Sequence, residues 1–321
     1  MLKKNLIDFT YLVRRNMKIF YLDKVSFLSS LITPFILVFL YITFLKNVYD
    51  KSLLSVLAEF NILSIPDNLK NWFSAGWLIS SIMATTCVTL TFCGNTIVVS
   101  DKLSGANKDI EAAPVSRMTI YLSYFVANFL STFFVALIAL GLGFIYIGIV
   151  GWYLSFIDVV MLTVSTVLLT LFGSLFASII MSFFKSQGAI TASSIIVSAL
   201  YGFVCGAYMP ISSFSPTVSN IIYCLPGTYG TMGFRHFFCH GALDELEKYI
   251  VGVADSQTAS LAVSSIKKGF DIEITAFGNT IDISQAILIL SSTIIVLLIS
   301  YSLIIYFKNF KKKTVADKLK R

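Results

Sequence analysis

Two histidines are the clearest candidates in this sequence for metal binding. His236 and His240, the only histidines, lie one helical turn apart with Cys239 between them. Such spacing could place ligands on one helix face, but zinc would need a fourth ligand or a water and a shell of supporting hydrogen bonds. We expect an interfacial polar cluster at the end of a hairpin in preference to a metal site.

Motifs for nucleotide, metal or acyl chemistry are absent from the sequence. It contains no G-x-x-x-x-G-K-[ST] loop, no HExxH motif and no evident combination of Ser, His and an acid. Gly227, Gly230 and Gly233 recur every third residue in an apolar stretch, which favours close helix packing over phosphate binding. We therefore expect no catalytic residue and no cofactor on this chain.

Polar side chains recur at helical spacing in two apolar stretches. The first stretch carries Ser81, Thr85 and Thr89. The second carries Thr191, Ser194, Ser198 and Tyr201, followed by Cys205 and Tyr208. Such stripes either satisfy hydrogen bonds between helices or line a route for a substrate. Both interpretations turn these faces away from lipid, and we keep the residues as candidates for a substrate route.

The composition indicates that membrane-spanning helices position these residues. The 321 residues are 56% hydrophobic and 13% charged, with a mean hydropathy of +0.83, whereas about a quarter of the residues in a soluble domain are charged. A spanning helix needs roughly 20 apolar residues. Charge-free stretches of that length predict an all-α polytopic membrane protein with six transmembrane helices, over residues 25–45, 74–99, 118–149, 157–184, 189–210 and 284–307.

The charges predict that both termini are cytoplasmic. With that orientation most of the 24 Lys and Arg residues fall in inside segments, as the positive-inside rule requires. Attraction to anionic lipid headgroups then explains the net charge of +7, and we expect membrane lipids but no nucleic acid as partners. The six spans lack an ionisable residue at mid-depth, apart from Asp158 at an outer edge. Proton or sodium coupling through this chain is therefore not expected.

Other segments divide the chain further. Residues 1–24 repeat apolar side chains at spacings of three and four, which predicts an amphipathic helix in the membrane interface, and the alternative is a cytoplasmic cap on the bundle. Residues 270–283 alternate apolar and polar side chains around a Gly-Asn pair, which indicates a β-hairpin. We expect spans one to five within 25–210, with a coupling segment at 101–117, then a re-entrant hairpin at 211–240, a small extracellular α/β module at 241–283, span six at 284–307 and a basic cytoplasmic tail at 308–321. Cys224 and Cys239 could meet outside as a disulfide, and this stays open.

The mixed-charge segment "SDKLSGANKDIEAAPVSR" interrupts two long apolar runs. Composition alone favours a solvated loop whose charges fix the topology. The alternative is a short helix that docks into a groove on a soluble partner and transmits movement to the adjoining spans.

Two motifs resemble the permease subunits of type-2 ABC exporters, the superfamily that exports drugs, polysaccharides and teichoic acids. The run "DKLSGANKDIEAAPVSRMTIYLSYF" is similar to the family's cytoplasmic coupling region, an acidic residue, a Gly and a Pro-Val-Ser-Arg turn before a span. The run "GAYMPISSFSPTVSNIIYCLPGTYGTMGFRHF" resembles the family signature after span five, carried by Pro210, Pro216, Pro226 and Arg235. The coupling region departs from the pattern in Lys102 and Lys108, where relatives are often more acidic.

The resemblance implies a half-transporter in the cell membrane of a bacterium. A second, identical permease chain would complete a homodimer, and each chain would dock on a separate ATP-binding cassette subunit that holds ATP and magnesium. The contacts to that ATPase would come from Asp101, Leu103, Gly105, Ile110, Glu111, Pro114 and Arg117. The chain itself would not be an enzyme, and its cargo would be a hydrophobic or amphiphilic drug, lipid-like molecule or peptide. A membrane sensor or immunity component that binds an extracellular ligand without transport is the alternative.

Arg235 has two interpretations from the sequence. Its charge could anchor the re-entrant hairpin at the outer headgroups, or it could meet an anionic cargo. We expect anchoring.

Overall fold

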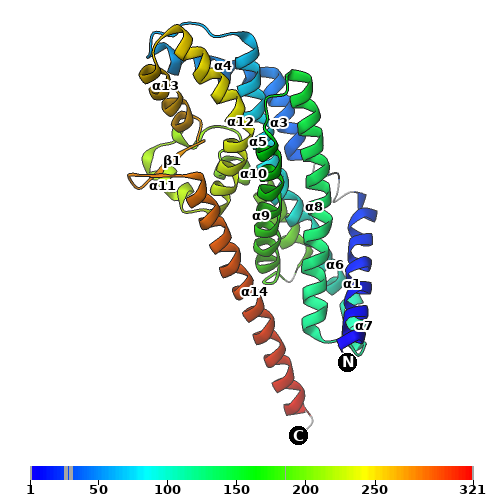
Figure 1. Ribbon diagram of the computed structural model, residues 1–321. Helices are drawn as coiled ribbons and strands as arrows, with labels where there is room; N and C mark the ends of the chain where they lie inside the picture. The colour runs from blue at the N-terminus through cyan, green and yellow to red at the C-terminus, as the bar shows by residue number, and fades with distance from the viewer. Residues whose placement is uncertain (1, 25–27, 29–31, 185, 320–321) are drawn as a thin grey trace.

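In the computed structural model the described residues are almost entirely helical, with one two-stranded sheet among them (Figure 1). It describes the backbone of residues 2–24, 28, 32–184 and 186–319, and the side chains of residues 6–24, 28, 34–184, 186, 188–189 and 192–307. The first half of the chain contains α1 (Leu2–Leu22), α3 (Ile32–Leu40), a π-helical turn (Tyr41–Leu45), α4 (Lys46–Ala58), α5 (Asp67–Gly94), α6 (Thr96–Ser104), α7 (Ala106–Ala112) and α8 (Arg117–Val150). The second half contains α9 (Phe156–Met181), α10 (Gln187–Val204), a 3-10 turn (Ile211–Ser213), α11 (Pro216–Tyr223), α12 (Pro226–Val253), α13 (Ser256–Gly269), β1 (Ile274–Ala276), β2 (Asn279–Ile281) and α14 (Ile283–Leu319).

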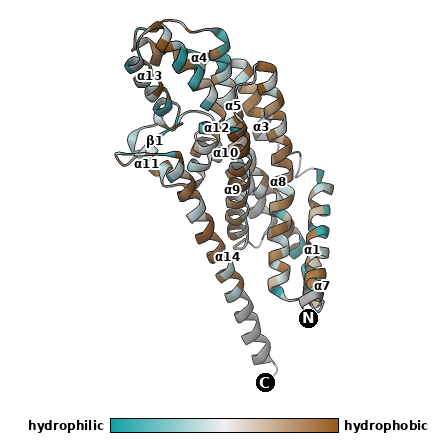
Figure 2. Ribbon diagram, in the orientation of Figure 1, coloured by the Kyte–Doolittle hydropathy of each residue, from teal (hydrophilic) through white to brown (hydrophobic). Residues whose placement is uncertain are grey.

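Four helices of the described chain are long and apolar enough to cross a membrane: α5 together with α6, α8, α9, and α14 as far as Phe307. They match the second, third, fourth and sixth predicted spans, and Figure 2 shows α8, α9 and the upper part of α14 as mostly apolar. The helix α5 is the centre of the bundle, because it packs against α3, α8, α9, α10 and α12. The small side chains of Ser74, Ala75 and Gly76 suit such close packing between membrane helices.

The other two predicted spans are not confirmed. Residues 25–27 and 29–31 of the first lie outside the described residues, and the described remainder is helical as α3 and the π-helical turn. The fifth is shorter than predicted, because α10 ends at Val204. Gly206 has φ 72°, and the N–H groups of Gly206 and Ala207 donate to the carbonyls of Phe203 and Gly202 at 3.1 and 2.7 Å. These bonds form a Schellman motif, which terminates a helix.

The extracellular module predicted at 241–283 has no boundary at its start. The helix α12 runs unbroken from Pro226 to Val253, so it leaves the bundle and enters the module as one element. There it packs with α4 and α13 in an apolar cluster that includes Leu53, Leu246 and Ile266. The predicted hairpin is confirmed as β1 and β2, with Ile274 opposite Ile281.

The helix α1 stands beside the lower half of α8 (Figure 1). Val13 and Phe20, two members of its predicted apolar stripe, are buried, and Asn16 beside them is buried as well. Leu6, in the same stripe, is 66% exposed. The helix is therefore confirmed, but α8 covers much of the stripe that we expected to lie in the membrane interface, because α8 continues far enough to flank α1.

Candidate functional site

The coupling segment is a helix, α7, at the end of the molecule where both chain termini lie (Figure 1). Gly105 joins it to α6 with φ 85°, a left-handed conformation that glycine adopts without steric cost. Of the predicted ATPase contacts, Leu103 and Pro114 are exposed, while Gly105, Ile110, Glu111 and Arg117 are half-buried. Asn107 donates to Oε1 of Glu111 at 3.1 Å, and Arg117 lies 3.9 Å from Oε2 of Glu111. The first contact lies within α7, and the second, an ion pair, links α7 to the start of α8.

Asp101 differs from its predicted role, because its carboxylate is buried inside the protein. It forms a bidentate ion pair with Arg15 of α1 and accepts a hydrogen bond from the Tyr124 hydroxyl of α8 at 2.5 Å. The hydrogen bond to Asp101 raises the pKa of the Arg15 guanidinium, which therefore stays charged. Asp101 thus holds α6 to α1 and α8, and it presents no free surface to an ATPase.

A break between α5 and α6 at Asn95 is a feature that sequence reasoning missed. Asn128 of α8 and the side chain of Asn95 both donate to the Thr91 carbonyl, at 3.1 and 3.2 Å. Ser178 of α9 donates to Oδ1 of Asn95 at 3.2 Å. A Cβ on Gly94 would lie 2.0 Å from Oδ1 of Asn128, so only glycine fits at that position. The sequence feature that could have indicated this break is the presence of Asn95, Asn128 and Ser178 in otherwise apolar helices.

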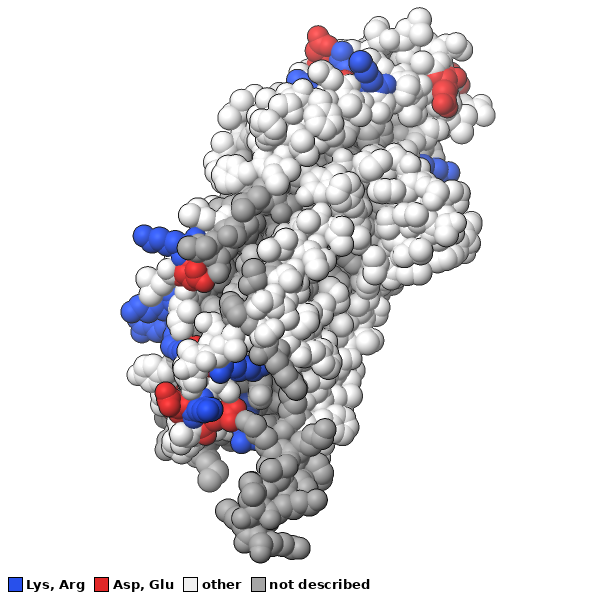
Figure 3. Space-filling view, turned by 180° about the vertical axis from the view of Figure 1, so that it is seen from behind, with Lys and Arg blue, Asp and Glu red and all other residues white. Residues whose placement is uncertain are grey.

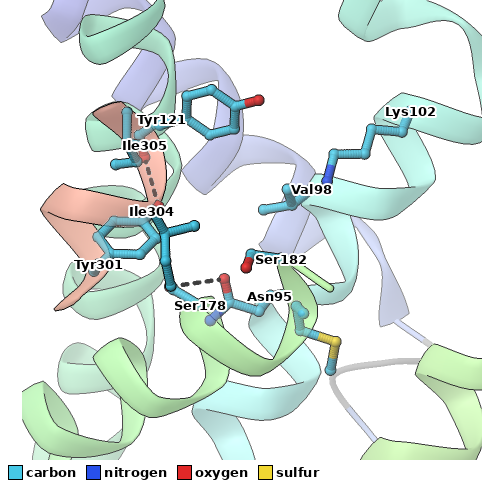
Figure 4. Close-up of a pocket in the computed structure, with 10 residues that line it drawn as sticks. Asn95, Val98, Lys102, Tyr121, Ser178, Ser182, Tyr301, Ile304 and Ile305 are labelled. Atoms are coloured by element: carbon cyan, nitrogen blue, oxygen red, sulfur yellow. Dashed lines mark hydrogen bonds between the residues drawn. The ribbon is translucent and has the colours of Figure 1, made fainter. Parts of the chain in front are cut away.

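A small cavity lies beside this break, between α6, α8, α9 and α14 (Figure 4). Asn95 and Ser178, which are hydrogen-bonded to each other, line it together with Tyr301, whose hydroxyl donates to the Tyr121 carbonyl at 3.3 Å. Its volume is about 20 Å³, which is room for a single water molecule. The cavity is therefore a packing feature of the break and is too small for a cargo.

The predicted route residues on α5 lie in the interior of the bundle. Ser81, Thr85 and Thr89 are fully buried, and the two threonine hydroxyls donate to carbonyls of their own helix. The Ser81 hydroxyl has no hydrogen-bond partner among the described residues.

Some of the candidate route residues on α10 also lack hydrogen-bond partners within the described chain. The hydroxyls of Ser194 and Tyr201 are buried and also lack a partner within the described chain, whereas the Thr191 side chain lies outside the described residues. A Cβ on Gly227 of α12 would lie 2.5 Å from the Tyr201 hydroxyl, so this glycine admits the tyrosine. Because α10 packs on α5, the two polar stripes lie in one region of the bundle.

The prolines of the predicted re-entrant hairpin begin its helical segments. Pro216 and Pro226 occupy the first turns of α11 and α12, where the missing N–H has no cost. Pro210 directly precedes the 3-10 turn.

Arg235 differs from its predicted place at the headgroups, because protein surrounds it. It is 1% exposed and pairs with Asp271, which is 2% exposed. Burial raises the pKa of the Asp271 carboxyl, while Arg235 and the N–H groups of Ile211 and Ser212 favour its charged form. A charge held this way is not free to bind cargo.

The histidine cluster agrees with the expectation of a polar contact. Nδ1 of His240 lies 3.2 Å from the Asp158 carboxylate, and the His236 and His240 rings stack with centroids 6.1 Å apart. Within the described residues no group of three side chains is placed to hold a metal ion. Cys239 is buried and Cys224 is exposed, and both are free thiols, so the structure contains no disulfide between them.

A family model described as ABC-2 type transporter matches residues 7–238, from α1 to the middle of α12. No curated protein and no solved structure matches the chain. The matched region includes α7 and Arg235, and it stops before Asp271.

Proposed function

Because the chain belongs to the ABC-2 type transporter family, we propose that it is the membrane permease of an ATP-driven exporter and works with a separate ATP-binding cassette subunit. We propose further that two copies of the chain form the permease. The cargo in this proposal is a hydrophobic or amphiphilic compound, and ATP and magnesium bind to the partner subunit.

The observation that supports this proposal is the position of α7, which lies at the end of the molecule opposite α4 and is directly connected along the chain to α6 and α5. The helix α7 continues through Gly105 into α6, and α6 continues through Asn95 into α5. The apolar window of α5 and α6 is 78% buried, against 17% for that of α14. A force applied to α7 would therefore reach the most enclosed of the four spans.

In this proposal α6 and α7 together act as a lever that turns about the break at Asn95. The nine residues of α6 extend about 13 Å at 1.5 Å per residue. Asp101, near the end of α6, carries Arg15 and Tyr124 with it, so α1 and α8 would follow the same movement. The break at Asn95 is the point where α6 can turn relative to α5.

The unpaired hydroxyls support a route between α5 and α10. The hydroxyls of Ser81, Ser194 and Tyr201 are buried without partners in the described chain, and such groups cost free energy unless something satisfies them. A passing amphiphile with a polar group would do so in part of the cycle.

The test replaces the half-buried and exposed face of α7 in the complex with its ATPase. We expect Ile110→Asp and Glu111→Lys to lower partner-stimulated ATP hydrolysis by about tenfold. A tenfold loss corresponds to about 1.4 kcal/mol, which is less than the cost of removing a residue that dominates an interface. Glu59→Lys, an exposed charge reversal at the opposite end of the molecule, is the matched control. Unchanged hydrolysis in both α7 variants at normal expression would remove α7 from the mechanism. Failure of the unsubstituted chain to bind any ATP-binding subunit would favour a sensor.

A further inference from the structure

The buried ion pair between Arg235 and Asp271 joins the predicted external module to the helix bundle. Nη1 of Arg235 on α12 lies 3.1 Å from Oδ2 of Asp271, which follows α13. The guanidinium carbon of Arg235 lies 4.5 Å from the centroid of the Trp77 ring on α5, within the range of a cation–π contact. The pair thus connects α12, the module and the central helix of the bundle.

Both partners also hold the turn that follows α10. Arg235 donates through Nη2 to the Gly206 carbonyl. The backbone N–H groups of Ile211 and Ser212 donate to the two oxygens of Asp271, so the carboxylate caps the 3-10 turn. The segment 206–213 is therefore fixed at its first residues by Arg235 and at its last residues by Asp271.

The segment that carries Asp271 is itself fastened to α5. The indole N–H of Trp77 donates to the Phe270 carbonyl at 3.2 Å, and the Phe270 ring contacts the Phe73 ring edge-to-face at 4.9 Å. Asp271 has φ 52°, a left-handed conformation that is uncommon outside glycine and persists where contacts impose it. The position of the carboxylate is thus determined by the surrounding protein.

We propose that Asp271 is a positioning residue for transport: directly, and through Arg235, it holds the turn 206–213 in place beside α5 and keeps the outer end of α10 closed. This inference rests on the proposed function. The turn is the outer end of α10, which carries Ser194 and Tyr201 of the candidate route. If the turn leaves α5, the route opens toward the outside. The external module is then part of the gate and not a separate receptor.

The physical basis is the cost of a single buried charge. Removing one partner of a buried ion pair leaves the other without compensation, and the structure must open to let water reach it. Asp271→Asn leaves Arg235 charged in a site that is 1% exposed. We expect the turn 206–213 to open in this variant.

A native thiol reports on this opening. Cys205 is 0% exposed and precedes Gly206, so it reacts only when the turn moves. In a Cys224→Ser background, which removes the exposed thiol, we expect Asp271→Asn to raise the rate of maleimide addition to Cys205 by about tenfold or more. Peptide mass spectrometry of the purified full-length chain measures this rate. The matched control is Glu273→Gln, which breaks a neighbouring, partly exposed ion pair with Lys267 at 3.3 Å.

A second variant covers the case in which Asp271→Asn fails to fold. Arg235→Met combined with Asp271→Asn leaves no charge at this buried site, and removing both charges is far less costly than removing one. It also lacks the bond to the Gly206 carbonyl, so we expect it to fold and still to expose Cys205. Protection of Cys205 equal to that in Glu273→Gln, in either folded variant, overturns the proposal.

Nucleotide dependence separates a gate from a merely structural contact. In the complex with its ATPase, we expect a non-hydrolysable ATP analogue to raise Cys205 labelling of the unsubstituted chain, and Asp271→Asn to be labelled fast with or without it. Labelling that nucleotide never changes, in a complex that hydrolyses ATP, contradicts the gate. Absence of ATP hydrolysis would instead contradict the proposed function, so the two failures are distinguishable.

Discussion

Asp101 takes part in contacts with two other helices. Its carboxylate receives Arg15 from α1 and the Tyr124 hydroxyl from α8, and only 7% of the residue is exposed. Hydrogen bonds to a charged group contribute more than neutral ones, about 1.5–3 kcal/mol each. Asp101 therefore acts by holding α6 against α1 and α8.

We expect Asp101→Asn to lower the free energy of unfolding by about 1.5–3 kcal/mol, because the amide keeps the shape and loses the charge. The midpoint of thermal unfolding in detergent measures the loss. Asp67→Asn is the control, since Asp67 pairs with Lys70 but its side chain is 89% exposed. No measurable change is expected there. Equal midpoints for the two variants would show that Asp101 holds nothing.

Tyr201 and Tyr124 allow a comparison of a buried hydroxyl without a partner in the described chain and one with a partner. The Tyr201 hydroxyl has no partner in the described chain, so Tyr201→Phe should leave the unfolding midpoint unchanged or raise it, because removing an unsatisfied buried group costs nothing. Tyr124→Phe removes a hydroxyl that bonds to Asp101 and should lower the midpoint. A loss in Tyr201→Phe as large as in Tyr124→Phe would mean that the Tyr201 hydroxyl has a partner inside the protein.

Sequence reasoning predicted local features well and distant pairings poorly. The hairpin at Ile274–Ile281 follows from the alternation of apolar and polar side chains, which is a pattern of a few residues. Arg15 and Asp101 are 86 residues apart, and Arg235 and Asp271 are 36 apart. Nothing in the local composition of either site indicates its partner, so we misplaced both Asp101 and Arg235.

At the scale of elements, the break between α5 and α6 sets what α7 can move. Gly94 lets α8 approach so closely that Oδ1 of Asn128 would be 2.0 Å from an added Cβ. The Asn128 amide in turn holds the Thr91 carbonyl. The Thr91 carbonyl of α5 thus accepts hydrogen bonds from the side chains of Asn128 on α8 and of Asn95 at the break. Side chains that insert into the backbone hydrogen bonds of a helix are a known cause of kinks.

We expect Gly94→Ala to displace Asn128 and to lower partner-stimulated ATP hydrolysis, since the methyl group cannot fit without moving the amide. Gly94→Ala combined with Asn128→Ser should recover much of the activity, because serine vacates the space. Gly141→Ala in α8, where nothing lies within 4 Å of an added Cβ, is the control. A double variant no better than Gly94→Ala would mean that the loss does not come from this contact.

The turn at Gly105 belongs to the same scale. Its φ of 85° is left-handed, yet no atom lies within 4 Å of an added Cβ, so only backbone strain opposes substitution. We expect Gly105→Val to cost about 1–2 kcal/mol and to misorient α7, and Gly105→Asn, which tolerates this conformation, to cost less. The affinity of each variant for the ATP-binding subunit measures how strongly the substitution misorients α7, and we expect it to be lower for Gly105→Val than for Gly105→Asn. Equal binding would show that the orientation of α7 does not depend on this turn.

Charged side chains form two groups on the face shown in Figure 3. One group lies at the top and the other extends along one edge of the lower half, and a broad uncharged surface lies between them. Both termini and α7 share one end, and α4 and α13 lie at the other (Figure 1). This distribution agrees with a chain that crosses a membrane along its long axis.

The orientation of that axis is the last prediction. The proposed docking of an ATPase requires α7 to be cytoplasmic, so Asp109 on α7 and Glu59 beyond α4, both exposed, should lie on opposite sides of the membrane. In a Cys224→Ser background the remaining native cysteines are buried. A membrane-impermeant maleimide should then label Glu59→Cys in intact cells, and Asp109→Cys only after the cells are permeabilised. The reverse pattern would place α7 outside, where no ATP-binding subunit could reach it, and would contradict the exporter proposal together with the role of α7.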